Sequence, residues 1–158
     1  MRLVKRECSD PAFFDEVFSK AEELFLALNN GDFPYLIPLN FVRLGQRIYM
    51  HCALEGTKLD LIRRDGRVAF SLTTDVRIDR AKSTTYYKSV CGTGRAAVVE
   101  ETEEKRLALD SLAERYAALC PRPAPEANVR RVGIIRIDIL SLTGKRCLPK
   151  GESAPEPV

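Results

Sequence analysis

The sequence has no tryptophan, a single histidine and no pair of cysteines in a C-x-x-C spacing. With one histidine and five scattered cysteines we expect no metal site, and an odd number of cysteines does not suggest a disulfide framework. The G-x-G-x-x-G, P-loop, G-x-S-x-G and H-E-x-x-H motifs are also missing. These absences argue against a Rossmann dinucleotide site, a phosphate-transfer enzyme, a serine hydrolase and a zinc protease.

The chain also lacks a long apolar run and a large excess of one charge. No stretch approaches the roughly 18 apolar residues of a membrane span, and the N-terminus shows no signal-peptide pattern. We therefore expect a cytoplasmic protein with no membrane partner. The formal net charge is +3, and basic residues alternate with acidic ones except in RRDGR and KRCLPK, so we expect no nucleic-acid partner.

What is present fits one globular domain. The 158 residues are 45% hydrophobic and 30% charged, which is enough for one buried core and short for two domains. The sequence predicts a single domain over residues 1–147. Residues 148–158 are polar and rich in proline, and we expect a disordered C-terminal tail there.

Three segments carry helix signals. The S-D-P run at residues 9–11 offers a capping side chain followed by proline, which predicts a helix over residues 11–22. The run GTKLDLIRRD predicts a short helix that begins near Gly56. The run TEEKRLALDSLAERYAALC predicts an amphipathic helix with Thr102 as its cap. Its apolar positions include Leu107, Leu112 and Tyr116.

Other segments alternate apolar and polar residues with a period of two, which is typical of strands. The expected strands lie at residues 24–28, 33–41, 47–53, 67–74, 89–101 and 132–144, with a loop over 75–88 and a proline-rich connector over 121–129. Gly92 and Gly94 suggest a bulge or a close backbone neighbour. Many short strands joined by tight turns, with few helices, predict a small β-barrel, closed or partly closed, with flanking helices.

The start of the second helix is suited to an anion. Lys58 lies in its first turn, where the positive end of the helix disfavours a cation, and a bound phosphate would compensate. Free amides, the Thr57 hydroxyl and the Lys58 ammonium would hold that phosphate, and Gly56 would let it approach the backbone. The alternative is a solvent-facing lysine offset by Glu55.

His51 lies on the strand that leads into this helix. Alternation along the strand puts Ile48 and Met50 on one face and Tyr49 and His51 on the other. His51 therefore either faces a ligand or is a half-buried histidine satisfied by the backbone. We interpret Cys52 as a small packed side chain, because no second histidine is present to activate it.

Pro34 and Pro38 have no amide donor, so the strand that contains them is expected at an edge or a bulge of the sheet. The residues that follow, Leu39, Asn40 and Phe41, are placed to offer backbone groups and an amide to a flat heteroaromatic ring. Ordinary solvent exposure explains these residues equally well.

Five segments occur in a characteristic order and spacing: FPYLIPLNF, IYMHCALEGTKLDLI, RVAFSLTTD, YYKSVCGTGRAAVVE and EEKRLALDSLAERY. Together they resemble the pyridoxamine 5'-phosphate oxidase-like split-barrel flavoproteins, and most closely their nitroimidazole-resistance (Nim) branch. The resemblance covers roughly residues 9–145. Its most specific piece is the H-C/S-A-x-x-G-x-K run, formed here by His51, Cys52, Ala53, Gly56 and Lys58.

The resemblance implies an FMN-binding split β-barrel with antiparallel, Greek-key-like strands. It also implies a homodimer whose flavin lies in a groove made by both subunits. It places the cofactor-binding residues at Pro38, Leu39, Asn40 and Phe41 along the flavin ring, at His51, Cys52 and Ala53 along the ring and ribityl chain, at Thr57 and Lys58 on the phosphate, and at Ser89 and Val90 on the strand below the flavin. His51 matches the active-site histidine of the Nim branch, where an imidazole that titrates near pH 6.5 would donate a proton to the substrate.

Two classes of function follow from this resemblance. One is an FMN-dependent, nitroreductase-like oxidoreductase that reduces a small organic acceptor such as a nitroaromatic, with NAD(P)H as a transient donor. The other is a flavin-binding module without turnover, a carrier or sensor. A haem-binding split barrel with His51 as axial ligand is a third possibility. Fold alone does not separate these classes.

Two departures from the family pattern concern the substrate. The segment DRAKSTTYYKS lacks the bulkier aromatic or cysteine-containing loop that is common in relatives, which leaves the substrate face undefined. Pyridoxamine phosphate oxidase itself needs basic residues for its phosphorylated substrate, and only Arg136, Lys145 and Arg146 are available in the C-terminal strand and tail. We therefore do not expect pyridoxamine phosphate oxidase activity.

Overall fold

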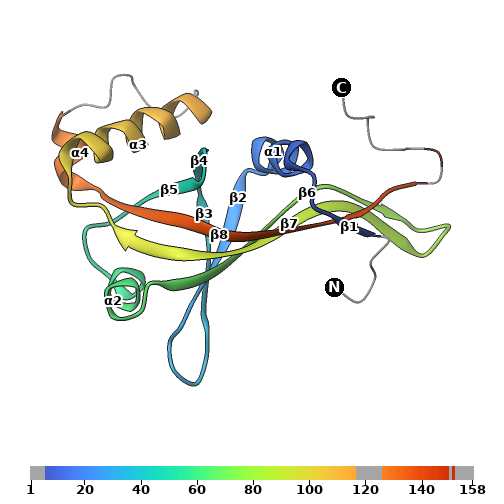
Figure 1. Ribbon diagram of the computed structural model, residues 1–158, viewed down its shortest axis with the longest axis horizontal. Helices are drawn as coiled ribbons and strands as arrows, with labels where there is room; N and C mark the ends of the chain where they lie inside the picture. The colour runs from blue at the N-terminus through green and yellow to red at the C-terminus, as the bar shows by residue number, and fades with distance from the viewer. Residues whose placement is uncertain (1–5, 117–125, 150, 152–158) are drawn as a thin grey trace. The chain divides into compact units, whose positions relative to one another are not determined.

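The computed structural model describes residues 6–116, 126–149 and 151, and this part of the chain contains eight strands and four helices (Figure 1). The helices are α1 (Pro11–Lys20), α2 (Thr57–Arg64), α3 (Thr102–Arg115) and α4 (Glu126–Arg131). The strands are β1 (Glu7–Cys8), β2 (Glu23–Leu28), β3 (Tyr35–Asn40), β4 (Val42–Leu44), β5 (Arg47–Cys52), β6 (Arg67–Asp79), β7 (Thr84–Val98) and β8 (Gly133–Cys147). No helix within these described ranges is long and apolar enough to cross a membrane.

The strands form one sheet in the order β3-β2-β6-β7-β8-β5-β4, and β1 pairs with β8 outside this path. The pairings of β1 with β8, β2 with β3, β4 with β5 and β5 with β8 are antiparallel. The prediction of a mainly β fold with flanking helices is therefore confirmed. β3 ends the strand order, so the prediction of an edge strand from Pro34 and Pro38 is also confirmed.

The segment predicted as a loop over residues 75–88 is a β-hairpin, and that prediction was wrong. β6 continues to Asp79 and β7 begins at Thr84, so the loop is limited to residues 80–83. The Asp79 carboxylate accepts the Lys82 amide at 3.0 Å, and Ser83 has a φ of 47°, which together close a tight turn. The turn lacks the glycine or proline that usually marks one in a sequence.

Two smaller predictions at the third helix and its connector also need correction. The cap of α3 is Glu101, whose carboxylate accepts the amides of Glu103 and Glu104, and not Thr102. Leu107 is 53% exposed and does not belong to the buried face. Residues 126–129 of the predicted connector belong to α4, which ends at Arg131, and residues 121–125 lie outside the described residues. The predicted tail over 148–158 also lies mostly outside them.

The chain forms two compact units. The described residues of the first unit come from Met1–Ala21, Ser71–Cys91 and Leu142–Val158, and those of the second from Glu22–Phe70 and Gly92–Ser141. The long strands β6, β7 and β8 contribute residues to both units.

In the first unit, α1 buries an apolar face made of Phe13, Phe14, Val17 and Phe18. Its exposed side carries an ion-pair cluster with the hairpin. Lys20 binds Glu16 at 2.6 Å and Asp75 at 3.2 Å, and Lys88 contacts the same two carboxylates. Asp75 has a φ of 55°, which is uncommon for a residue other than glycine. The cluster therefore anchors an unusual backbone position of β6 to α1.

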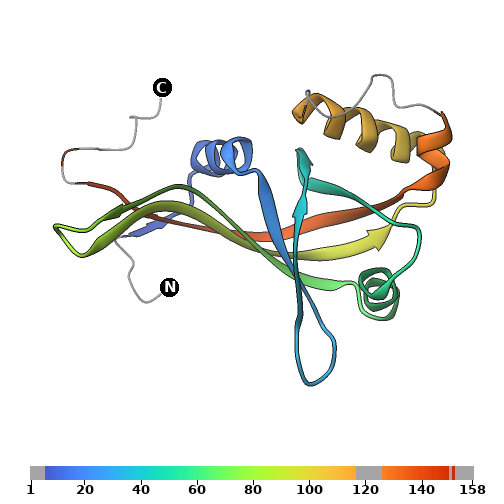
Figure 2. The ribbon, with the colours of Figure 1, turned by 180° about the vertical axis from the view of Figure 1, so that it is seen from behind.

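In the second unit, helices cover the sheet on both sides (Figures 1 and 2). α3 packs against β4 and β5, and α2 packs against β2. The core under α3 consists of Val42, Tyr49, Val99, Ala108, Leu112 and Ile134. On β5, Ile48 and Met50 are fully buried on the opposite face, opposite Ile137 and Ile135 of β8.

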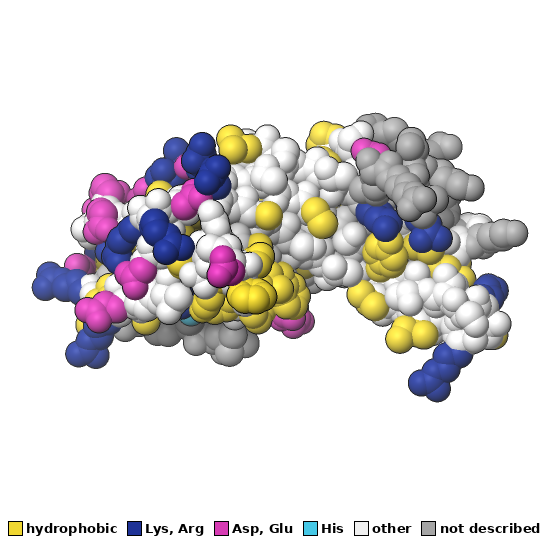
Figure 3. All heavy atoms as spheres, turned by 90° about the horizontal axis from the view of Figure 1, so that it is seen from below, with side chains coloured by type: hydrophobic (Ala, Val, Ile, Leu, Met, Phe, Trp, Pro, Cys, Tyr) yellow, Lys and Arg dark blue, Asp and Glu magenta, His cyan; other side chains and the backbone are white. Residues whose placement is uncertain are grey.

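The hairpin of β2 and β3 leaves one apolar face uncovered. Phe25 is paired with Pro38, and Ala27 is paired with Leu36. Phe25 is 43% exposed, Leu36 63%, and Phe33, beside the turn, 80%. Figure 3 looks from below Figure 1 toward the end of this hairpin and shows hydrophobic side chains at the surface there.

The structure confirms the predicted close approach of neighbouring backbone to Gly92 and Gly94. A Cβ atom at Gly92 would lie 2.3 Å from the Phe70 ring and 2.8 Å from the Ser141 carbonyl oxygen. A Cβ atom at Gly94 would lie 2.5 Å from Ile137 and 2.7 Å from the Asp138 carbonyl oxygen. Any side chain at either position would overlap backbone of β8.

The hydroxyl of Tyr116, at the end of α3, ties together two distant parts of the second unit. It accepts the Phe41 amide at 3.1 Å and lies 2.7 Å from the Glu22 carbonyl oxygen, to which it donates. Phe41 stands at the break between β3 and β4. The Arg115 guanidinium stacks 4.6 Å from the Phe41 ring, which reinforces the same junction.

Replacing Tyr116 with phenylalanine should lower the free energy of unfolding by about 1–3 kcal/mol, because a part-buried amide loses its acceptor. Urea unfolding measures this value. Tyr35→Phe is the matched control, because the Tyr35 hydroxyl makes no hydrogen bond to the described residues. Equal effects of the two substitutions would contradict the role assigned to Tyr116.

Candidate functional site

The residues predicted to hold a ligand are centred on the end of β5 and the start of α2, in the second unit. Register with β8 pairs His51 with Ile134 and Cys52 with Gly133. Directly paired residues share a face, so His51 lies on the same face as Tyr49 and Cys52 on the opposite face. The predicted alternation along this strand is confirmed.

His51 is exposed, whereas Tyr49, two residues earlier on the same face, is buried under α3. The atoms that surround the ring still exclude enough water to lower the pKa of the imidazole from its ordinary value of 6.5. His51 is therefore neutral at pH 7. A neutral imidazole carries one N–H donor and one nitrogen acceptor, and it can orient a polar ligand through either.

Cys52 is buried, and its environment fits a packed side chain. A Cβ atom at Gly133 would lie 3.1 Å from the Cys52 sulfur and 2.7 Å from the Ala53 carbonyl oxygen, so only glycine fits opposite this segment. Burial raises the pKa of the Cys52 thiol, and the nearby Lys58 ammonium opposes that rise. The thiol is protonated at neutral pH.

The start of α2 has free backbone amides. The Gly56 carbonyl accepts the first helical hydrogen bonds, from the amides of Leu59 and Asp60 at 2.9 and 3.3 Å. The amides of residues 57 and 58 precede these bonds and have no acceptor within the helix. Gly56 has a φ of 130°, which other residues rarely adopt, and no side chain among the described residues caps α2. By contrast, carboxylates cap α1 and α3.

The predicted ring-contacting residues 38–41 have different environments. Pro38 and Asn40 are exposed, and Leu39 is half-buried. The Asn40 amide group donates to the Glu22 carbonyl at 3.1 Å, which fixes its orientation. Phe41 is fully buried, so only its backbone remains for contact with a ligand.

Thr57 and Ala53 are exposed, and Lys58 is half-buried. Ser89 and Val90 belong to β7 in the first unit. The Ser89 hydroxyl donates to the Lys145 carbonyl at 3.4 Å, and Val90 is fully buried.

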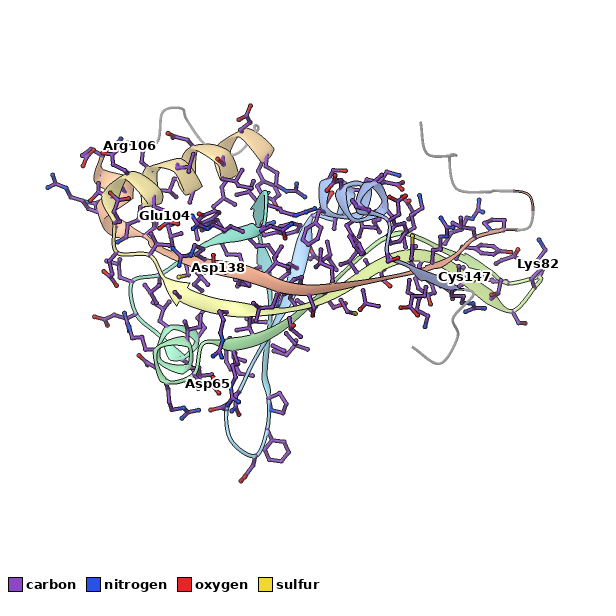
Figure 4. The ribbon with its side chains drawn as sticks, viewed as in Figure 1. Asp65, Lys82, Glu104, Arg106, Asp138 and Cys147 are labelled. Carbon is purple, nitrogen blue, oxygen red and sulfur yellow. The ribbon has the colours of Figure 1, made fainter. Side chains whose placement is uncertain are left out.

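A charged network under α3 was missed by sequence reasoning. The Glu104 carboxylate accepts the Tyr49 hydroxyl at 2.8 Å and the Arg136 guanidinium at 3.2 Å. Arg136 also binds Asp138 at 3.1 Å, and Asp138 binds Arg47 at 3.2 Å. Figure 4 shows Glu104 on α3 and Asp138 on β8. Glu104 is 55 residues from Tyr49 and 32 residues from Arg136 in the sequence, so no local pattern could have revealed the network.

These contacts shift the pKa values of the network. Burial and the hydrogen bond to Glu104 raise the pKa of Tyr49. Burial alone would raise the pKa of Glu104, but the hydrogen bonds from Tyr49 and Arg136 lower it. Arg136 is committed to two carboxylates of its own unit, which supports the interpretation that it does not hold a phosphorylated substrate.

Comparison with known proteins decides the family. A family model described as pyridoxamine 5'-phosphate oxidase matches residues 14–146. The chain belongs to this family. A search of curated proteins found no match to this chain.

Solved structures with the same fold include a proposed 5-nitroimidazole antibiotic resistance protein from Bacteroides thetaiotaomicron. It has 22% sequence identity and a TM-score of 0.78, and the match covers 89% of this chain and 86% of that chain. The flavocytochrome Anf3 from Azotobacter vinelandii has 14% identity and a TM-score of 0.78, with 99% and 76% coverage. An FAD and heme binding protein from Mycobacterium smegmatis has 19% identity and a TM-score of 0.77, with 94% and 77% coverage. The split-barrel fold of this family is therefore confirmed for the chain.

His51 is the only histidine of this family member, so its titration can be followed without assignment ambiguity. Removal of water from the ring disfavours the imidazolium, and the NMR titration midpoint of its ring protons should fall below 6.5. The chain unfolded in urea provides the control, with a midpoint near the ordinary value. A folded-state midpoint at or above 6.5 would show that the ring is fully hydrated or paired with an acid.

Proposed function

We propose that this protein is an FMN-binding flavoprotein of the cytoplasm that reduces a small organic acceptor such as a nitroaromatic. The start of α2 carries the proposal. It joins free amides, a glycine with a positive φ, the Thr57 hydroxyl and the Lys58 ammonium, and together these fit a phosphate monoester. Solved structures with the same fold support the proposal, because one is named a flavocytochrome and another an FAD and heme binding protein.

In this proposal the chain's residues bind and orient the cofactor, and the flavin supplies hydride or electron transfer. Thr57 and Lys58 hold the phosphate, and residues 38–41 and 51–53 line the ring and ribityl chain. The overall reaction takes one hydride from NAD(P)H and one proton from solution, and it converts a nitro group to a nitroso group and water, with NAD(P)+ as the oxidised product.

His51 is the proposed active-site residue. Because its imidazole is neutral at pH 7, we assign it a hydrogen bond to the acceptor or the flavin, and protonation of the product becomes its role as the pH falls. This assignment refines the expectation that the imidazole acts mainly as a proton donor.

A haem-binding protein is the second candidate, because two proteins of the same fold are named for cytochrome or heme. The exposed, neutral His51 imidazole would be its axial ligand. The visible spectrum of the purified protein separates the candidates, since flavin and haem absorb differently. Oxidation of NADH with a nitroaromatic acceptor then separates a reductase from a flavin carrier or sensor without turnover.

The decisive test compares FMN with riboflavin, which lacks the phosphate. Lys58→Ala should weaken FMN binding by about 1.5–3 kcal/mol, the scale of a hydrogen bond to a charged group, and leave riboflavin binding unchanged. Titration with fluorescence quenching measures both affinities. Arg63→Ala, at the other end of α2, is the matched control and should alter neither affinity. A wild-type chain that binds no FMN would overturn the proposal, and equal losses for both ligands would remove Lys58 from the phosphate site.

We further propose a homodimer in which both subunits wall the flavin and the apolar face of the β2–β3 hairpin lies at the interface. An exposed apolar face beside an edge strand is the kind of surface that a second copy covers. The interface of a two-fold dimer uses the same patch of both chains.

Leu36→Arg should shift the protein from a dimer toward the 17.8 kDa monomer, because it places a charge in the proposed contact. Sedimentation measures the mass, and FMN titration should show weaker binding in the monomer. Leu107→Arg, at an exposed leucine of α3, should leave the dimer intact. A wild-type monomer that binds FMN tightly would contradict the shared groove.

A further inference from the structure

The Tyr116 hydroxyl lies at the centre of a hydrogen-bonded junction in the second unit. Its oxygen is 2.7 Å from the Glu22 carbonyl oxygen and 3.1 Å from that of Phe41, so the hydroxyl donates to the nearer Glu22 oxygen. It accepts the Phe41 amide at 3.1 Å and the Arg115 guanidinium at 3.3 Å. A hydroxyl has one donor and two acceptor positions, and these bonds use all three. The orientation of the hydroxyl is therefore fixed.

The Glu22 carbonyl oxygen also binds the side chain of Asn40. The Asn40 amide nitrogen donates to this oxygen at 3.1 Å. A carbonyl oxygen has two lone pairs, so Tyr116 and Asn40 together occupy both. Glu23, the next residue, is directly paired with Asn40 across the β2–β3 ladder. Tyr116, at the end of α3, thus holds the carbonyl to which the Asn40 side chain is bound.

The bond to Glu22 determines what Asn40 can offer to a ligand. A primary amide has two N–H donors and one carbonyl acceptor. Glu22 takes one donor, which leaves one N–H beside one carbonyl oxygen on an exposed side chain. Phe41 differs from Asn40, because its side chain is fully buried and its backbone amide is bound to Tyr116. Of these two neighbours, Asn40 is the one whose side chain can read a ligand.

A donor beside an acceptor is the complement of an imide edge, in which an N–H lies beside a C=O. The isoalloxazine ring of FMN carries such an edge, where N3–H lies between two carbonyl groups. Asparagine reads the edges of nucleic-acid bases through the same pair of hydrogen bonds. A ring that covers Asn40 also excludes water from these bonds, which strengthens them.

We propose that Tyr116 is a positioning residue of the flavin site: through the Glu22 carbonyl it holds the Asn40 amide in the orientation that binds the imide edge of the ring. The inference rests on the proposed function, because it takes FMN as the ligand. Tyr116 acts only through Asn40, since its hydroxyl has no donor left for the ring. Recognition of the imide thus depends on a residue of α3, which packs beside β4 (Figure 1).

The test compares FMN with 3-methyl-FMN, in which a methyl group replaces the N3 hydrogen and the phosphate is unchanged. Fluorescence quenching on titration of the full chain measures both affinities. The wild type should bind FMN about tenfold more tightly, the effect of one or two net hydrogen bonds. Asn40→Ala should remove this preference. Tyr116→Phe should lower it to about threefold or less, because an amide that is not held in place loses more entropy on binding.

A purely structural role of Tyr116 predicts a different result. Loss of folded protein weakens the binding of both ligands by the same factor, and the preference for FMN is then unchanged. Tyr35→Phe, and Asn30→Ala in the connection between β2 and β3, are the matched controls and should keep the full preference. Circular dichroism and thermal melting verify that each variant is folded.

Equal affinities of the wild type for the two ligands would overturn this inference alone, because FMN would still bind. A folded Asn40→Ala or Tyr116→Phe protein that keeps the full preference would also overturn it. If Tyr116→Phe does not fold, the Asn40→Ala result decides. A wild-type chain that binds neither flavin would overturn the proposed function and this inference together.

Discussion

Strand β7 lies between β6 and β8, and it can do so because Gly92 and Gly94 have no side chains. A Cβ atom would lie 2.8 Å from a backbone oxygen of β8 at Gly92 and 2.7 Å from one at Gly94, which is too close at both positions. The close approach fixes the centre of the sheet, and β8 in turn pairs with β5, which carries His51. The position of the imidazole therefore depends on two residues more than forty positions away in the sequence.

Local patterns were sufficient for most of the fold. Period-two alternation located β2, β3, β5, β8 and parts of β6 and β7, but not β1 or β4. The S-D-P run and the glycine before Thr57 located α1 and α2 within about two residues. The loop predicted over residues 75–88 was wrong because side-chain contacts, and not a glycine or proline, form the turn there. The turn after Asp79 contains no glycine or proline, and a tertiary ion-pair cluster holds Asp75 in its uncommon conformation. Such contacts cannot be read from neighbouring residues.

The candidate site shows the same division. The order His51, Cys52, then an uncapped helix start with Lys58 is local, and the sequence was enough to propose it. Whether the imidazole is neutral depends on how much water the folded chain removes from it, and the burial of Phe41 depends on α3. Neither property has a sequence signature. Assignment of the remaining site residues and of FMN stays a prediction.

The backbone of Asp75 has a consequence for ionic strength. A non-glycine residue with a positive φ costs about 1 kcal/mol or more, whatever the salt concentration. Its ion pairs with Lys20 and Lys88 lie near the surface, and the side chain of Asp75 is 39% exposed, so added salt screens them. High salt thus weakens the compensation and leaves the cost, so the base of the β6–β7 hairpin loses stability as the salt concentration rises.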